Sequence, residues 1–239
     1  MEHYELNPDF RVEIVHLETE NEDVIIIDNF LKNIEPVVNF ATHVAYLEPV
    51  GSDGTLFPGK RDVMPEPYYR AFRQLLLSLQ ARGVFNREHK ALYVHRCKLS
   101  LVTQKACELK LLQRIPHIDS TDDNTFAAVH YIAGKESNGT SIYRYIPENL
   151  IKITPRNQHL FSDVIEQTKN NESEHQGYLN SNTALFEQVI NIKAKQNRVV
   201  LYKSNLLHCA NLDNDYEFTG DIKNGRLSIS SFLELTKVC

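Results

Sequence analysis

The feature that most limits the fold of this chain is a series of β-like segments in its last two thirds. Six stretches are rich in Val, Ile, Thr, Tyr and Phe and are separated by turn-forming residues. They are Ala91–Thr103, Thr125–Ile132, Ser141–Tyr145, Gln188–Ala194, Arg198–Tyr202 and Arg226–Leu235. Because helices do not alternate with these strands, the series favours a sandwich, jelly roll or barrel over a parallel sheet. We therefore predict a mainly β core.

The first third of the chain has a different pattern. Glu35–Tyr46 and Glu66–Arg82 carry apolar residues at helical spacing, which predicts two helices. Val24–Asp28 is short, apolar and β-branched, and it predicts one buried strand. Gly51–Pro67 is rich in Gly, Pro and Asp, which is typical of a loop. The expectation is a helical N-terminal third that supports the β core.

Length, charge and cysteine content restrict the class of protein. With 239 residues, 42% of them hydrophobic, we expect one domain: helical support over about 1–90 and the β core over about 91–239. A net charge of −5 argues against binding nucleic acid through a basic surface. Four cysteines without a CxxC pair fit a reducing compartment. No signal peptide or membrane-length apolar run is apparent, so a cytoplasmic protein without a membrane partner is expected.

One polar stretch interrupts the β-like part of the chain. Gln167–Thr183 is rich in Asn and has few apolar residues that could anchor it. Long loops inside compact domains are usually functional or disordered. We predict a mobile loop at the mouth of the pocket, and the sequence leaves open whether it acts as a lid or is a plain surface loop.

His117-Ile118-Asp119 is the first candidate for chemistry. In a strand, residues i and i+2 point to one face, so an imidazole and a carboxylate could bind the same metal. Alone the motif says little, because short His-x-acid patterns arise by chance. His16-Leu17-Glu18 has the same form, and we interpret it as a surface segment.

Three later residues raise the significance of this motif. His208 follows the strand at 198–202, and Arg226 opens the last strand with Ser228 on the same face. A His-x-Asp, a distant His and a following Arg together form a two-His-one-carboxylate metal site with an anion anchor. The structural alternatives are a core histidine at 208 and an arginine at 226 paired with a buried carboxylate.

This order and spacing resemble the Fe(II)/2-oxoglutarate-dependent dioxygenase superfamily. The similarity covers roughly Lys98–Leu235 and, in one segment, extends to the prolyl-4-hydroxylase-like branch. Tyr131-Ile132-Ala133 stands where that branch has a Tyr-Leu-Asn strand. Asn138–Tyr143 stands where it has a GGxTxF turn, with Asn138 in place of Gly and Tyr143 in place of Phe. The resemblance implies a double-stranded β-helix, which is a jelly-roll or cupin-like core.

The resemblance also implies a cofactor and its ligands. His117, Asp119 and His208 would bind Fe(II), which accepts imidazole and carboxylate ligands together. Three coordination positions would remain, two for 2-oxoglutarate and one for O2. Asp119 argues against the halogenating branch, which lacks this carboxylate so that chloride can bind the iron.

The far carboxylate of 2-oxoglutarate requires its own binding residues. Arg226 would bind it, because a guanidinium is planar, permanently charged and able to donate two parallel hydrogen bonds. Tyr131 and Ser228 would add hydroxyl donors. His130 adjoins Tyr131 and points to the opposite face, so it is interpreted as structural. Arg144 and Arg61 could contact a substrate carboxylate, but each such residue is more often a solvated surface charge.

The implied activity is that of an oxidoreductase. It would couple the conversion of 2-oxoglutarate to succinate and CO2 to oxidation of a free or carrier-bound small molecule, amino acid or peptide. Hydroxylation is expected, while desaturation, cyclisation and epimerisation stay open. A cupin-like metal-binding module or sensor is the alternative, and it would not need Arg226. A catalytically dead binding scaffold should have lost a metal ligand, and all three are present.

Overall fold

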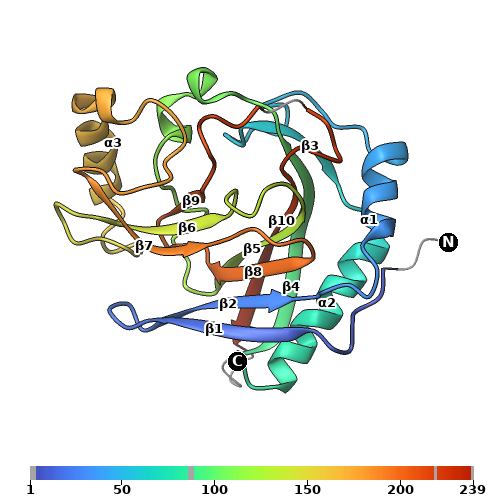
Figure 1. Cartoon of the computed structure of the whole chain (residues 1–239). Helices are drawn as coiled ribbons and strands as arrows, with labels where there is room; N and C mark the ends of the chain where they lie inside the picture. Colours follow the sequence, from blue (N-terminus) through green and yellow to red (C-terminus); the bar gives the residue numbers. More distant parts are fainter. Residues whose placement is uncertain (1–3, 86–88, 218–219, 238–239) are drawn as a thin grey trace.

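Two antiparallel β-sheets face each other in the computed structural model, which describes residues 4–85, 89–217 and 220–237. Figure 1 shows the sheets with α1 and α2 at one end and α3 at the other. The larger sheet has the strand order β1-β2-β8-β5-β10-β4-β3, and the smaller has the order β7-β6-β9. No helix within the described ranges is both long enough and apolar enough to cross a membrane.

The elements follow one another along the whole described chain. The strands are β1 Arg11–Leu17, β2 Glu22–Asp28, β3 Gly59–Val63, β4 His89–Val102, β5 Thr125–Ala133, β6 Thr140–Tyr145, β7 Phe186–Ile192, β8 Arg198–Lys203, β9 His208–Ala210 and β10 Leu227–Lys237. The helices are α1 Glu35–Asn39, a π-helical turn at Phe40–Val44, α2 Glu66–Ala81 and α3 Leu160–Asn170. Short 3-10 turns lie at Ala106–Glu108, Leu111–Gln113 and Glu172–Glu174. The six strands predicted after residue 90 are all present, so the mainly β prediction is confirmed.

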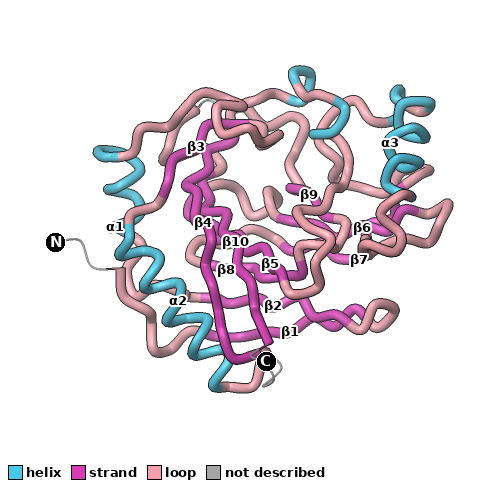
Figure 2. The backbone as a smooth tube through the Cα atoms, turned by 180° about the vertical axis from the view of Figure 1, so that it is seen from behind, coloured by secondary structure: helices cyan, strands magenta, loops and turns pink. Residues whose placement is uncertain are grey.

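Helix α2 covers the outer face of the larger sheet, as the reverse view in Figure 2 also shows. Tyr68, Phe72 and Leu75 on α2 belong to one buried cluster with Leu99 of β4 and Ile229 of β10. Since neighbouring residues of a strand point to opposite faces, the residues that alternate with these point between the two sheets. This alternation separates a helix-covered core from the interior that holds the candidate site.

The prediction of a helical N-terminal third is wrong. Three strands, β1, β2 and β3, lie in that part of the chain and form both edges of the larger sheet. β3 lies inside the stretch predicted as a loop. Its main chain pairs with β4, with Arg61 opposite Ser100. A Cβ atom at Gly59 would lie 2.0 Å from the Leu101 carbonyl oxygen, so glycine permits this close approach of the strands.

The stretch predicted as a mobile loop is partly helical. Its first residues belong to α3, and a 3-10 turn follows at Glu172–Glu174. Val164 and Thr168, one turn apart on α3, are completely buried, and Val164 packs on the outer face of the smaller sheet. Tyr178 and Leu179 are buried as well. Within the predicted stretch, Tyr178 and Leu179 therefore act as apolar anchors, although the composition is mainly polar.

A buried histidine links α2 to the larger sheet. His130 is 1% exposed, its Nδ1 lies 3.1 Å from the Tyr68 hydroxyl, and its Nε2 lies 3.2 Å from Oδ1 of Asn197. An amide oxygen only accepts, so Nε2 carries the hydrogen and Nδ1 accepts from Tyr68. Burial lowers the pKa of His130 to about 3. His130 thus has a structural role, on the face opposite Tyr131.

This histidine should make folding stability depend on pH. Between pH 6.5 and about 3 the unfolded chain binds a proton at His130 and the folded chain does not. The stabilisation of the folded state that comes from keeping His130 neutral is complete above pH 6.5 and is lost as the pH falls. The free energy of unfolding should drop by about 2 kcal/mol between pH 7 and 5 for this reason. Urea unfolding at both pH values should show a smaller loss in His130→Gln than in wild type, whereas the exposed His16→Gln control should match wild type. Equal losses in wild type and His130→Gln would contradict this prediction.

Candidate metal centre

Backbone pairing between two distant segments forms the centre of the candidate site. The amide of His117 donates to the carbonyl of His208, and the amide of His208 donates back to the carbonyl of His117, both at 2.9 Å. Two residues later, the amide of Asp119 donates to the carbonyl of Ser204 at 2.8 Å. Directly paired residues of an antiparallel bridge project to the same face. The two imidazole centroids are consequently 4.5 Å apart.

The side chains of His117, Asp119 and His208 form a three-donor cluster. One ligand atom from each lies within 4.8 Å of the others. Asp119 lies between the rings, with Oδ1 3.9 Å from Nε2 of His117 and Oδ2 3.3 Å from Nε2 of His208. Ligands at right angles on a metal with bonds of about 2.1 Å are about 3 Å apart. Small side-chain rotations would therefore bring all three donors onto one ion, and the donor set fits Fe(II).

The electrostatics favour the metal-binding forms of two of these groups. Desolvation by surrounding protein, followed by repulsion from His208, lowers the pKa of His117, although 47% of its side chain is exposed. Burial acts to raise the pKa of Asp119, but the nearby His208, His117 and Arg61 outweigh burial and lower it. At neutral pH, His117 keeps a lone pair and Asp119 is ionised, as metal binding requires.

His208 is held in a single orientation. Its Nδ1 lies 2.8 Å from the carbonyl oxygen of Leu206, which can only accept, so Nδ1 carries a hydrogen and Nε2 is the ring nitrogen that can bind a metal. The Tyr202 ring packs against the imidazole with centroids 4.7 Å apart and planes at 62°. These contacts hold the ring with Nε2 near Asp119. Outer contacts of this kind commonly orient metal-binding histidines.

The predicted anchor, Arg226, is a buried cation that is 3% exposed. Its Nε donates to the carbonyl of Asn138 and its Nη2 to the carbonyl of Gly139, both at 3.2 Å. Within the described residues, no carboxylate forms an ion pair with the guanidinium, and burial is the largest influence on its pKa, which it lowers. A buried charge without a counter-ion is costly. This position is therefore suited to an anionic ligand.

Hydroxyl groups surround this guanidinium. The Arg226 Cζ atom lies 5.8 Å from the ring centroid of Tyr131, whose hydroxyl is 2.6 Å from Oγ1 of Thr140. One hydrogen of this hydroxyl pair remains available, because a single O–H···O bond uses only one. Ser228, directly opposite Tyr131 in the sheet, is buried, and its Oγ has no partner in the part of the chain that is described. The fold thus brings Arg226, Tyr131 and Ser228 together.

Arg61 is not a solvated surface charge, which corrects the simpler interpretation of the sequence. It is 8% exposed, and its Nε donates to Oγ of Ser100 at 3.0 Å. Its Nη1 donates to Asp53 at 3.3 Å and to Thr55 at 3.2 Å. It also acts electrostatically on Asp119. The burial of Arg61 could not be predicted from the sequence, because the composition of the stretch that contains its strand, β3, is typical of a loop.

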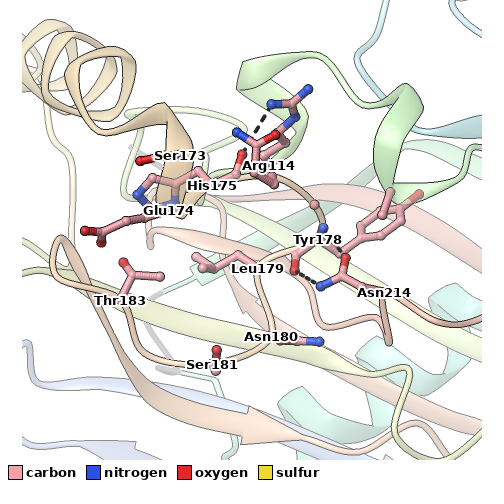
Figure 3. Close-up of a pocket in the computed structure, with 13 residues that line it drawn as sticks. Arg114, Ser173, Glu174, His175, Tyr178, Leu179, Asn180, Ser181, Thr183 and Asn214 are labelled. Carbon is pink, nitrogen blue, oxygen red and sulfur yellow. Dashed lines mark hydrogen bonds between the residues drawn. The ribbon is translucent and has the colours of Figure 1, made fainter.

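The segment that follows α3 lines a cavity of about 350 Å³ (Figure 3). His175 on its wall is 2% exposed, and neither of its ring nitrogens has a partner among the described residues. Other polar groups here stabilise the segment itself: the Asn214 side chain hydrogen-bonds the Tyr178 amide and carbonyl, and Arg114 donates to Glu172. The candidate metal ligands do not line this cavity. A smaller cavity of about 230 Å³ adjoins Tyr131 instead.

Solved structures with a similar course of the chain include enzymes described as dependent on 2-oxoglutarate, also called α-ketoglutarate. SnoN, a non-heme epimerase from nogalamycin biosynthesis, has a TM-score of 0.46 and 11% identity, covering 88% of this chain and 76% of its own. HygX from Streptomyces hygroscopicus, with nickel and 2-oxoglutarate bound, has a TM-score of 0.45 and 13% identity, with coverage of 89% and 82%.

An N-substituted L-amino acid dioxygenase from Burkholderia ambifaria AMMD, in complex with α-ketoglutarate, has a TM-score of 0.41 and 9% identity, covering 92% of this chain and 85% of its own. Similarities at this level decide neither the reaction nor the substrate of this chain. No curated protein matches the sequence. A family model, in contrast, matches residues 8–233, which contain all the candidate site residues. The chain therefore belongs to DUF6445, described as a family of unknown function.

Proposed function

We propose that this protein is a non-haem iron oxidoreductase that couples oxidative decarboxylation of 2-oxoglutarate to oxidation of a small-molecule, amino-acid or peptide substrate. The main support for the proposal is that the metal cluster and a buried cation lie in one interior. A cluster of two imidazoles and a carboxylate lies in the same interior as Arg226, a buried cation that no described carboxylate neutralises. Two tyrosines of the cluster between the sheets lie next to these groups: Tyr202 packs against His208, and Tyr131 lies against the Arg226 guanidinium.

The connectivity supports a double-stranded β-helix as the fold of this core. Strands β4, β5, β8 and β10 lie side by side in the larger sheet, and β6, β7 and β9 form the smaller one. The His117–His208 bridge adds the segment of His117 to the free edge of β9. The chain therefore passes back and forth between two layers of four, with β6 and β7 as one consecutive pair within the smaller layer, and this path supports a jelly roll. In this arrangement His117 and His208 are neighbours in one sheet, while Arg226 opens a strand of the other.

Different residues of this chain would bind the metal ion and the cosubstrate. His117, Asp119 and His208 would hold Fe(II) and leave one side of the ion open. Arg226 would bind the far carboxylate of 2-oxoglutarate, with Ser228 and Tyr131 as hydroxyl donors. Fe(II), when bound, supplies the activation of O2 by which 2-oxoglutarate is converted to succinate and CO2 and the substrate is oxidised. Hydroxylation is the expected outcome.

A cupin-like metal module without oxygenase activity is the alternative. It would account for the metal cluster but not for the buried guanidinium or for Ser228, whose Oγ is enclosed and unpartnered. A bound dicarboxylate would give the guanidinium a counter-ion and the Ser228 hydroxyl a hydrogen-bond partner. Natural proteins rarely leave buried polar groups unsatisfied without a reason. The oxygenase proposal therefore explains more of the described site.

Anaerobic addition of Fe(II) and then 2-oxoglutarate to metal-free protein tests the proposal. We expect a weak visible charge-transfer band that needs both components and does not form with Zn(II), which has no redox chemistry. Admission of air should then produce succinate slowly. His208→Ala, which removes one donor, should give neither signal. Absence of the band together with absence of 2-oxoglutarate binding would overturn the proposal, while metal binding alone would favour the cupin-like module.

A further inference from the structure

We infer that Tyr202, which sequence analysis did not single out, is a further binding residue for 2-oxoglutarate and donates its hydroxyl hydrogen to a carboxylate oxygen of this cosubstrate. The inference rests on the proposed function. It extends the anion pocket from Arg226 toward the metal cluster.

The alternation of β8 directs Tyr202 between the sheets. Val199 and Leu201, its neighbours at odd positions, belong to the cluster that α2 covers. Val200 and Tyr202 belong to the cluster between the sheets, together with Tyr131. Tyr202 is only 2% exposed. Its ring is therefore part of the interior that contains the candidate site.

Contacts place Tyr202 between the two halves of the site. On one side its ring packs against His208, with centroids 4.7 Å apart. On the other side, Tyr131 shares the cluster between the sheets with Tyr202, and the Arg226 Cζ atom lies 5.8 Å from the Tyr131 ring centroid. The Tyr202 hydroxyl would then lie between the metal cluster and this anchor. An extended dicarboxylate that joined the iron to Arg226 would pass this hydroxyl. The position of Tyr202 thus matches the path of the cosubstrate.

The hydroxyl of Tyr202 has no hydrogen-bond partner in the described parts of the chain. The Tyr202 side chain is almost completely buried, and the contact described for its ring is the packing against His208. Comparable tyrosines nearby are satisfied: Tyr131 contacts Thr140, and Tyr143 donates to the carbonyl of Leu179. Buried phenols usually have such a partner. At neutral pH the Tyr202 phenol is an unused donor, and a carboxylate oxygen would satisfy it.

The test is Tyr202→Phe, which keeps the ring against His208 and removes only the hydroxyl. In anaerobic protein loaded with Ni(II), the Kd of 2-oxoglutarate should rise about 10- to 100-fold, as for a lost hydrogen bond to a charged group. The affinity for Ni(II) alone should stay within about twofold of wild type. Titration calorimetry measures both quantities. A matched control is Tyr68→Phe, which removes a buried phenol hydroxyl on the α2 side and should leave the Kd unchanged.

The results of this experiment distinguish failure of the role of Tyr202 from failure of the proposed function. If wild type binds 2-oxoglutarate and Tyr202→Phe binds it equally well, the role of Tyr202 is wrong and the proposed function stands. If Ni(II)-loaded wild type does not bind 2-oxoglutarate, the proposed function fails and the inference fails with it. A weaker Kd in Tyr202→Phe, with unchanged metal affinity and an unaffected Tyr68→Phe control, supports the inference.

Discussion

Asp119→Ala should lower the affinity of the protein for Fe(II) by at least about 100-fold and abolish succinate formation. Asp119 supplies the carboxylate of the described cluster, and its position between the two rings lets it contact the metal beside both. Changing a group that only orients a metal ligand already lowers the metal affinity by about 10- to 100-fold. Loss of the charged ligand itself should lower the Fe(II) affinity at least as much. Anaerobic competition with an iron chelator measures the affinity.

A matched control for this variant exists in the chain. Asp23 contacts His16 at 2.7 Å, so Asp23→Ala also removes a carboxylate from a histidine, but at an exposed position. Its Fe(II) affinity should equal that of wild type. If Asp119→Ala bound Fe(II) as tightly as wild type, the three-ligand assignment would be wrong. The same measurement on His117→Ala should show a comparable loss, because each residue contributes one donor.

Arg226→Ala should have the second largest effect and should act on the cosubstrate rather than the metal. A charge-assisted contact to a desolvated carboxylate is worth about 2–5 kcal/mol. The Kd of 2-oxoglutarate should therefore rise about 30- to 4,000-fold. Arg226 donates to the Asn138 and Gly139 carbonyls and to none of the metal ligands, so Fe(II) affinity should change little. Calorimetry on anaerobic protein measures both affinities.

Two further variants make the Arg226 experiment specific. Arg226→Lys keeps the charge but loses the planar fork, so its Kd should lie between those of wild type and Arg226→Ala. Arg144→Ala removes an arginine that pairs with Glu187 in the other sheet, and the Kd should stay at the wild-type value. An unchanged Kd in Arg226→Ala, with intact Fe(II) binding, would favour the cupin-like module.

Much of the β core could be predicted because local composition and burial agree there. The stretch that became β8 is apolar and β-branched, and the protein buries it on both faces. His117 and Asp119 were recognisable because a spacing of two residues is sufficient to put both on one face. The prediction that they meet His208 depended on the resemblance to a known family. No local pattern could provide it.

The parts that were missed depend on tertiary contacts. β3 contains Gly, Lys, Arg and Asp, and it is a strand only because β4 offers it a paired edge. In α3, the spacing of Leu160, Val164 and Thr168 was an available helical signal, but the polar residues that follow obscured it. Tyr202 was assigned to a strand correctly. Sequence gives no means of telling a tyrosine with a satisfied hydroxyl from one without.

The main-chain bridge between His117 and His208 also bears on when the protein can acquire a metal. The two residues are far apart in sequence, so closing the loop between them has an entropic cost that only the completed sheets offset. A chain that is still being synthesised lacks the proposed site until β9 has emerged and paired. Metal loading would therefore follow folding. An ion bound there would stabilise the folded chain by an amount that grows with the logarithm of the ion concentration above its Kd, so the free energy of unfolding would depend on the metal supply.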